Sequence, residues 1–93
     1  MPLARHPFAS VSYTSIHGVR FPMIDGKLSV WGQVSDHALS ERADRDGAKT
    51  GGTRERFERV REECEKIAGN KYDAGKLIME GETPVVTVSS GEL

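Results

Sequence analysis

The stretch Thr53–Asp73, TRERFERVREECEKIAGNKYD, is the one segment whose periodicity is long enough to predict a helix by itself. Its less polar residues recur at helical spacing and form a single stripe: Phe57, Val60, Cys64, Ile67 and Ala68. Almost every other position is Arg, Glu or Lys, so the remaining face must lie in water. The rest of the fold must therefore cover this stripe.

The chain has 93 residues, which is enough for one domain over residues 1–93 and too few for two hydrophobic cores. At this size one helix packed on one sheet leaves little room for a large enclosed substrate cavity. Charged residues make up 29% and hydrophobic residues 37%, a balance typical of globular rather than disordered chains. The composition therefore predicts a small folded domain.

The net charge of -1 is spread evenly along the chain. Residues 1–35 carry +2, residues 36–53 carry -1 and residues 67–93 carry -2, while residues 54–66 hold five basic and five acidic side chains. A protein that binds nucleic acid usually has a basic face, and a helix that binds a membrane surface is usually basic and amphipathic. Neither is visible, so the charge pattern argues against both classes of partner.

Cys64 is the single cysteine, so it cannot form a disulfide within the chain. Its place on the apolar stripe predicts a reduced thiol that packs as a small hydrophobic group. Residues 1–10 lack the apolar region of a signal peptide, and no run approaches the roughly 18 apolar residues of a membrane span. These features lead us to expect a cytoplasmic protein.

Residues 18–34, GVRFPMIDGKLSVWGQV, predict a β-hairpin that turns at Asp25-Gly26. Alternate residues of its two strands form an apolar or small face, which the long helix is expected to cover. The expected pairs on that face are Met23 with Leu28, Phe21 with Val30 and Val19 with Gly32.

The same register places Arg20 opposite Trp31 and Pro22 opposite Ser29 on the second face. Because Pro22 has no N–H, it cannot complete a hydrogen-bonded pair. A four-residue loop, residues 24–27, keeps the faces and moves Pro22 to a non-hydrogen-bonded site. Its missing donor then points outward, so the first strand is expected to have either a free edge or an interrupted neighbour there.

The segments around the hairpin and the long helix are shorter. Residues 1–7 are expected to form a loose N-terminal arm. Ser35 is a good N-cap for a short helix. Residues 44–52 are rich in glycine and predict a flexible surface loop, after which Thr53 is expected to cap the long helix.

Residues 84–90, PVVTVSS, predict a strand with Val86 and Val88 on one face. Residues 76–80 either pair with that strand as a second hairpin or continue the end of the long helix. Together the elements predict an α+β fold. A small antiparallel sheet of three or four strands, made of the N-terminal hairpin and the C-terminal strand, packs against one long amphipathic helix, and one short helix completes the fold.

Several short motifs occur in a characteristic order: GVRF at residues 18–21, an Asp-Gly turn, VSDHAL at 34–39, a charged helix from Phe57, KYDAG at 71–75 and VVTVSSGEL at 85–93. Over residues 13–93 this order and spacing resembles the bacterial domain-of-unknown-function family numbered 1488. The resemblance implies a small α+β fold in bacterial proteins that have no assigned activity, substrate or cofactor. Residues 45–52 depart from it, since they are more polar and richer in glycine than expected between the family's two helices.

The residue types that bind metals or attack substrates are scattered. His6, His17, His37 and Cys64 show no close spacing of the kind found in zinc sites. No motif nominates a nucleophile with a base, and Cys64 lies on the apolar stripe, where a thiolate is disfavoured. We therefore predict no catalytic residue, no cofactor and no metal.

One constellation stands out on the second face of the hairpin: Arg20 with Trp31, joined by His17. An Arg over an indole beside an exposed edge is a candidate binding patch for a protein partner or a nucleobase. The alternatives are a cross-strand cation–π pair that stabilises the hairpin by about 0.5–1 kcal/mol, or a Trp31 that is covered by the N-terminal arm or by the long helix.

The leading hypothesis is a non-enzymatic interaction or regulatory module that binds another protein, or a second copy of itself, through the hairpin edge or the Trp31 face. Pro22 and the polar second face motivate it. The alternative is weak nucleic-acid binding by Arg20, Trp31 and the arginines of residues 54–61, against which the interleaved acids argue. A third hypothesis is a small enzyme whose composite site lies at a dimer interface and leaves no local signature.

Overall fold

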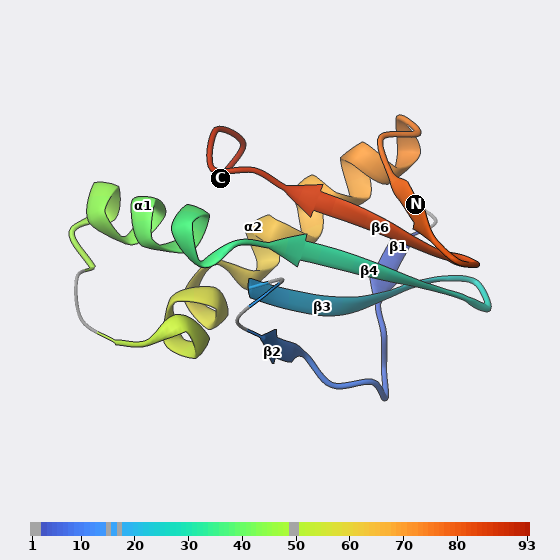
Figure 1. Ribbon diagram of the computed structural model, residues 1–93, viewed down its shortest axis with the longest axis horizontal. Helices are drawn as coiled ribbons and strands as arrows, with labels where there is room; N and C mark the ends of the chain where they lie inside the picture. The colour runs from blue at the N-terminus through green and yellow to red at the C-terminus, as the bar shows by residue number, and fades with distance from the viewer. Residues whose placement is uncertain (1–2, 15, 17, 49–50) are drawn as a thin grey trace.

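A mixed β-sheet lies against one long helix (Figure 1). The structure, a computed structural model, describes residues 3–14, 16, 18–48 and 51–93. In these residues the strands and helices are, in chain order, β1 (Leu3–Arg5), β2 (Ser12–Thr14), β3 (Gly18–Asp25), β4 (Leu28–Val34), α1 (Asp36–Asp46), α2 (Thr53–Asp73), β5 (Ile78–Glu80) and β6 (Thr83–Val88). The predicted α+β class is confirmed.

The strand order in the described residues is β1-β3-β4-β6-β5, with β2 also paired to β3. Only the β4–β6 pair is parallel; the other pairs are antiparallel. A parallel neighbour needs a long crossover, and both helices and β5 lie between β4 and β6 in the chain. The expected sheet of three or four antiparallel strands was therefore wrong in strand number and in the direction of this pair.

The predicted β-hairpin of β3 and β4 is present, but its register is shifted by two residues. Asp25 pairs with Leu28 across the two-residue turn Gly26-Lys27. Gly26 has a φ of 60° and takes the first central position, which is the pattern of a type II′ turn. Phe21 consequently pairs with Gly32 rather than with Val30. The two faces are as predicted, because a shift of two residues keeps every side chain on its side.

Pro22 lies opposite Trp31, at a site where its missing N–H costs nothing. Counting from the closing pair of the hairpin, hydrogen-bonded and non-hydrogen-bonded pairs alternate, and Pro22 falls in a non-hydrogen-bonded pair. Its outward edge is bordered by β1, which pairs with residues 23–25, and by β2, which pairs with residues 18–20. The expected interrupted neighbour is thus confirmed, and the alternative of a free hairpin edge is not.

Residues 3–5 form β1, although residues 1–7 were expected to be a loose arm. Leu3 is buried in the core, and the Arg5 guanidinium donates two hydrogen bonds to Glu65 of α2, at 2.7 and 2.8 Å. A strand of three residues has too little periodicity to be read from sequence, and these two contacts hold it in place.

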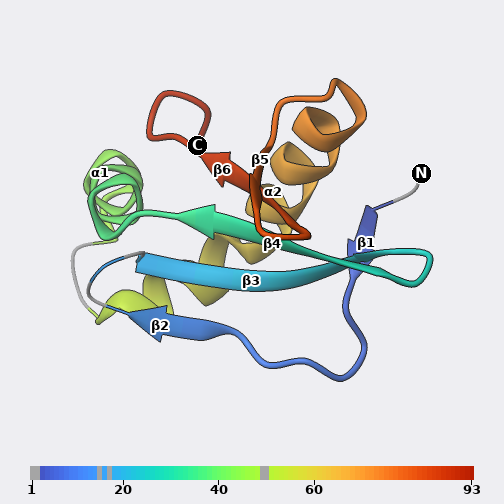
Figure 2. The same ribbon diagram turned by 45° about the vertical axis from the view of Figure 1, so that its right-hand side comes forward.

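The apolar stripe of α2 packs on the sheet as predicted. Phe57, Val60, Cys64 and Ala68 are buried, and Ile67 is partly buried against the same core. The rings of Phe57 and Phe21 lie 5.4 Å apart between centroids and form the middle of this core. In Figures 1 and 2, α2 runs behind the sheet, so the helix covers one face only.

The first helix begins as predicted and is longer than predicted. The Ser35 hydroxyl accepts a hydrogen bond from the Ala38 N–H at 3.1 Å, and Gly47, at a φ of 75°, ends the helix. Residues 44–46, which were expected in the flexible loop, are therefore helical. Gly52 rather than Thr53 is the N-cap of α2, and no side chain caps that end.

Residues 78–80 are a strand and not a continuation of α2, which ends at Asp73. β5 and β6 form the second hairpin, with Glu80 opposite Thr83 and a turn at Gly81-Glu82. Neither helix in the described residues combines the length and the apolar character that a membrane span requires.

Candidate functional site

The face of the sheet opposite α2, here called the open face, carries the candidate site. Strand pairing places the even-numbered residues of β3 and β5 and the odd-numbered residues of β4 and β6 on it. Both views of the fold show α2 on the far side (Figures 1 and 2). Among the described residues, the side chains of the open face are therefore covered mainly by one another.

Four directly paired residues, here called the apolar row, cross the open face from strand to strand. Pro22 of β3 pairs with Trp31 of β4, Trp31 with Val85 of β6, and Val85 with Ile78 of β5. Pro22 and Val85 are buried, Trp31 is half-buried and Ile78 is 61% exposed. The row is thus a continuous apolar band that ends in an exposed side chain at the edge of the sheet.

Arg20 of β3 makes hydrogen bonds across the open face to side chains of β4 and β5. Its Nε donates to Gln33 Oε1 at 2.8 Å, and its two terminal nitrogens donate to the two carboxylate oxygens of Glu80 on β5, one of them at 2.9 Å. The Arg20 side chain is only 13% exposed, and the hydrogen bond to Glu80 raises its pKa above the ordinary value. The Arg20–Glu80 pair therefore acts as a brace between β3 and β5.

The predicted constellation of Arg20, Trp31 and His17 is only partly assembled. Arg20 and Trp31 share the open face, but Arg20 pairs with Gln33 rather than with Trp31, because the hairpin register differs from the expected one. Trp31 is not a core residue, since α2 covers the opposite face. His17 lies outside the described residues.

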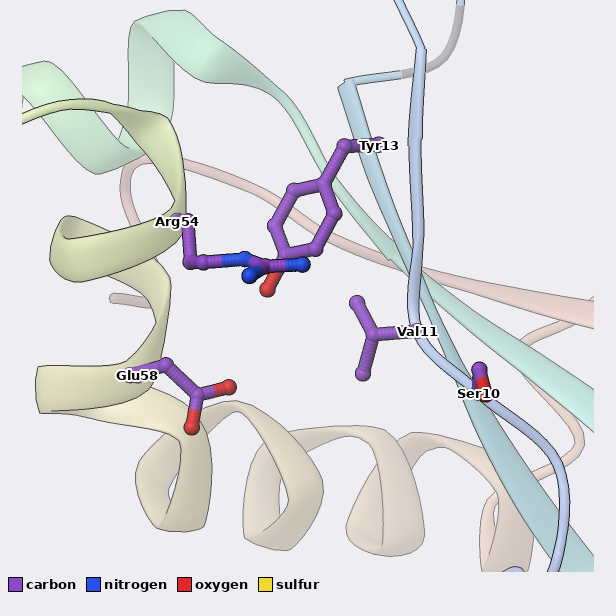
Figure 3. A pocket seen from close by; sticks show the side chains of 5 residues that line it. All are labelled: Ser10, Val11, Tyr13, Arg54 and Glu58. Atoms are coloured by element: carbon purple, nitrogen blue, oxygen red, sulfur yellow. The ribbon is translucent and has the colours of Figure 1, made fainter.

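A shallow hollow of about 380 Å³ lies between β2 and the start of α2 (Figure 3). The guanidinium of Arg54 reaches toward the Tyr13 ring, 5.2 Å from its centroid, in a cation–π contact. Val11 and Ser10 form one wall and Glu58, one helical turn after Arg54, forms another. Because Arg54 and Glu58 carry opposite charges, the hollow has no excess charge of either sign. It was not predicted, since the Tyr13–Arg54 contact joins elements far apart in the sequence.

A second hollow, of about 260 Å³, adjoins the exposed end of the apolar row. Ile78, Val85 and Leu77 line it together with Thr87 and two lysines. One of them, Lys71, is already engaged, because its Nζ donates to the Thr87 carbonyl at 2.6 Å and to Glu92 at 2.9 Å. The hollow lies beside Ile78, and its apolar side chains extend the apolar surface at this end of the row.

Among the described residues, no Ser, Thr or Cys that lines either hollow is hydrogen-bonded to a base. Cys64 lies in the core, where burial raises the pKa of its thiol to about 12. Within the same residues, no three His, Cys, Asp or Glu side chains are grouped as metal ligands.

The sequence prediction missed Ile78, Val85 and Glu80 as members of the open face. The alternation in residues 78–88 signals which side chains share a face, but nothing local signals that β6 pairs with β4. The brace and the row depend on that parallel pairing, which brings residues about fifty positions apart in the chain into one line.

Comparison with known proteins gave one match. No curated protein and no solved structure matched the chain. The protein-family model described as "Protein of unknown function (DUF1488)" matches residues 12–82, which include β2 to β5 and both helices. The chain therefore belongs to the DUF1488 family, as the order of its motifs indicated.

Proposed function

We propose that this protein is a non-enzymatic binding module that takes up another protein on its open face, with the apolar row as the contact. The observation that carries the proposal is the row itself: among the described residues, Pro22, Trp31, Val85 and Ile78 form one apolar band on the face opposite α2, in which Trp31 is half-buried and Ile78 is exposed. Tryptophan is enriched among the residues that contribute most to protein–protein binding, because its large ring removes much apolar surface from water when it is buried in an interface.

The charges of the open face favour a neutral, apolar partner surface. Among the strand residues that the structure describes, Arg20 and Glu80 are the charged side chains on this face, and they bind each other. A partner therefore meets no net charge there. We propose that it contributes an apolar side chain that packs between Trp31 and Ile78, with backbone or neutral polar groups around it.

Ion pairs of the arginines make nucleic-acid binding a weaker proposal than protein binding. A phosphate backbone is attracted by unpaired cations, yet Arg20 is held by Glu80, Arg59 by Asp46 and Arg61 by Glu65. Binding to the apolar row should also change little with salt, whereas nucleic-acid binding falls steeply as salt rises. The single, buried cysteine and the family resemblance support a bacterial cytoplasm as the setting for the proposed module.

The experiment is an affinity capture from host lysate with three variants compared side by side. Trp31→Ala and Ile78→Asp alter the apolar row, while Phe8→Ala removes an aromatic side chain that is 90% exposed and lies outside the strands. Circular dichroism first establishes that each variant is folded. The proposal predicts one captured protein that is lost with Trp31→Ala and Ile78→Asp and retained with Phe8→Ala at low and high salt.

Two results would overturn the proposal. A captured protein that binds both row variants as well as it binds the wild type would place the contact elsewhere. Captured material that absorbs at 260 nm and is released by salt would make the protein a nucleic-acid binder.

A further inference from the structure

His6 lies directly beside the Pro22 end of the apolar row. Antiparallel pairing continues one residue beyond β1, because the His6 N–H donates to the Pro22 carbonyl at 3.1 Å. Arg5, the residue before it, shares a face with Met23 and reaches Glu65 of α2. Successive side chains of a strand point to opposite faces, so His6 belongs to the open face. A histidine therefore stands at one end of the apolar row.

The His6 imidazole holds the start of the link between β1 and β2, which is the blue segment between these strands in Figure 2. Its Nδ1 accepts hydrogen bonds from the backbone N–H groups of Phe8, at 3.1 Å, and Ala9, at 3.0 Å. Asn and Asp commonly form such a turn through a side-chain oxygen, often with proline as the next residue. Pro7 occupies that position here. His6 thus takes the place that Asn or Asp usually has.

A histidine at this position makes the turn sensitive to pH. Nδ1 of His6 accepts the two hydrogen bonds only while the ring is neutral and carries its proton on Nε2. Protonation makes Nδ1 a donor as well, so that both backbone N–H groups lose their acceptor. Histidine is the side chain that usually changes its charge between about pH 5 and 8. The turn is therefore held by neutral His6 and opened by the protonated form.

Among the described residues, no acid forms an ion pair that would offset the charge of a protonated His6. The charged side chains of the neighbouring elements are Arg20 and Asp25 of β3, Glu80 of β5, Arg5 of β1, and Glu58, Arg61, Glu62 and Glu65 of α2. Arg20 is bound to Glu80 and Arg5 to Glu65. His37, in contrast, has an acidic partner in Glu41 at 3.2 Å. A proton on His6 thus adds an unpaired charge at the end of the apolar row.

We propose that protonation of His6 releases the link between β1 and β2 and switches off binding at the open face. Two effects act together. The released link fastens β1 and β2, which have three residues each, less firmly to β3. A charged imidazole also stands beside Pro22, where a bound partner would remove it from water. The inference rests on the proposed function and adds a regulation to it: the open face binds at about pH 8 and releases its partner toward about pH 5.

NMR of the purified chain tests the switch without any partner. In the wild type, the protection of the Phe8 and Ala9 amides against hydrogen exchange should fall at least about tenfold between about pH 8 and 5. His6→Asn should keep the protection constant, because the Asn side-chain oxygen takes the place of Nδ1 and does not titrate. His37→Gln removes another titrating ring and is the matched control, with the wild-type response.

Two results in the free chain would overturn the switch. One is equal protection of both amides at the two ends of the pH range in the wild type. The other is a fall in His6→Asn as large as that in the wild type, because a group other than His6 would then be responsible.

The captured partner tests the effect on binding. The wild type and His37→Gln should bind it about tenfold more weakly at about pH 5.5 than at about pH 7.5, whereas His6→Asn should bind it equally well at both. If binding by His6→Asn falls as steeply as binding by the wild type, the inference is overturned and the proposed function stands. If nothing is captured at either pH, the proposed function fails, and the amide protection alone decides whether His6 is a switch.

Discussion

The ring of Phe21 occupies the space in which residue 32 would carry a side chain. A Cβ built on Gly32 would lie 2.1 Å from Phe21 Cε2 and 2.2 Å from Cζ, far inside van der Waals contact. The ring cannot move away easily, because it packs against Phe57 of α2. A glycine in β4 therefore allows the sheet and α2 to come together around this ring.

Gly32→Ala should destabilise the protein because it forces Phe21 out of its place in a close-packed core. Overpacking of this kind typically lowers the free energy of unfolding by about 1–3 kcal/mol, which urea denaturation measures. Gly91→Ala is the matched control, since a Cβ at that position meets nothing within 4 Å. Equal stability of the two variants would show that the Phe21 ring is free to shift.

The thiol of Cys64 should be inert in the folded protein. Burial in the core raises its pKa to about 12, so almost no thiolate exists at neutral or mildly alkaline pH. A colorimetric thiol reagent should therefore react slowly with the native chain and rapidly in denaturant. Fast reaction of the native chain would mean that the apolar face of α2 separates readily from the sheet or is exposed to solvent.

Acid should weaken the protein partly through Glu92. A hydrogen bond from Lys71, helped by the Ser89 N–H, lowers the pKa of Glu92 from 4.5 to about 2. The lowered pKa means that Glu92 stabilises the fold above pH 4.5 and that this contribution is lost as the pH falls toward 2. The free energy of unfolding of Glu92→Gln should thus fall less over this range than that of the wild type.

The matched control for the acid series is Glu62→Gln, which removes an exposed carboxylate of α2. Its stability should follow the wild-type pH curve. If the curves of Glu92→Gln and the wild type are parallel between these pH values, the Lys71–Glu92 contact does not persist in solution.

The brace between Arg20 and Glu80 should show as a coupling between the two side chains. Because Glu80 is about half exposed, solvent screens the pair, and a double-mutant cycle of Arg20→Met and Glu80→Gln should give a coupling of about 0.5–1 kcal/mol. High salt should reduce it. A coupling of zero at low salt would mean that β3 and β5 are held only by the strands between them.

The sequence was informative where the signal is local and periodic. The stripe of α2 and the faces of the β3–β4 hairpin were correct, because periods of 3.6 and 2 residues decide which side chains are buried. The hairpin register was wrong by two residues, since such a shift preserves both faces. Two features fix the register. Gly26 takes a positive φ at the first turn position, and the Phe21 ring leaves no room for a side chain on the residue opposite it, which is Gly32.

The candidate site could be predicted only in part, because its members come together through pairing between distant segments. Arg20 and Trp31 were placed on one face from the alternation of a single hairpin. Glu80, Val85 and Ile78 reach that face through β6, whose parallel pairing with β4 follows from the crossover of α1 and α2 rather than from any local pattern. Short strands such as β1 carry too few residues to show a period.

Trp31, the single tryptophan of the chain, reports directly on whether the apolar row is the contact surface. Acrylamide quenching of its fluorescence is measured for the free protein and for the protein saturated with the captured partner. We predict moderate quenching of the half-buried ring in the free protein and strong protection, with a blue-shifted emission, in the complex. Unchanged quenching and emission in a saturated complex would contradict it, because Trp31 would then lie outside the contact.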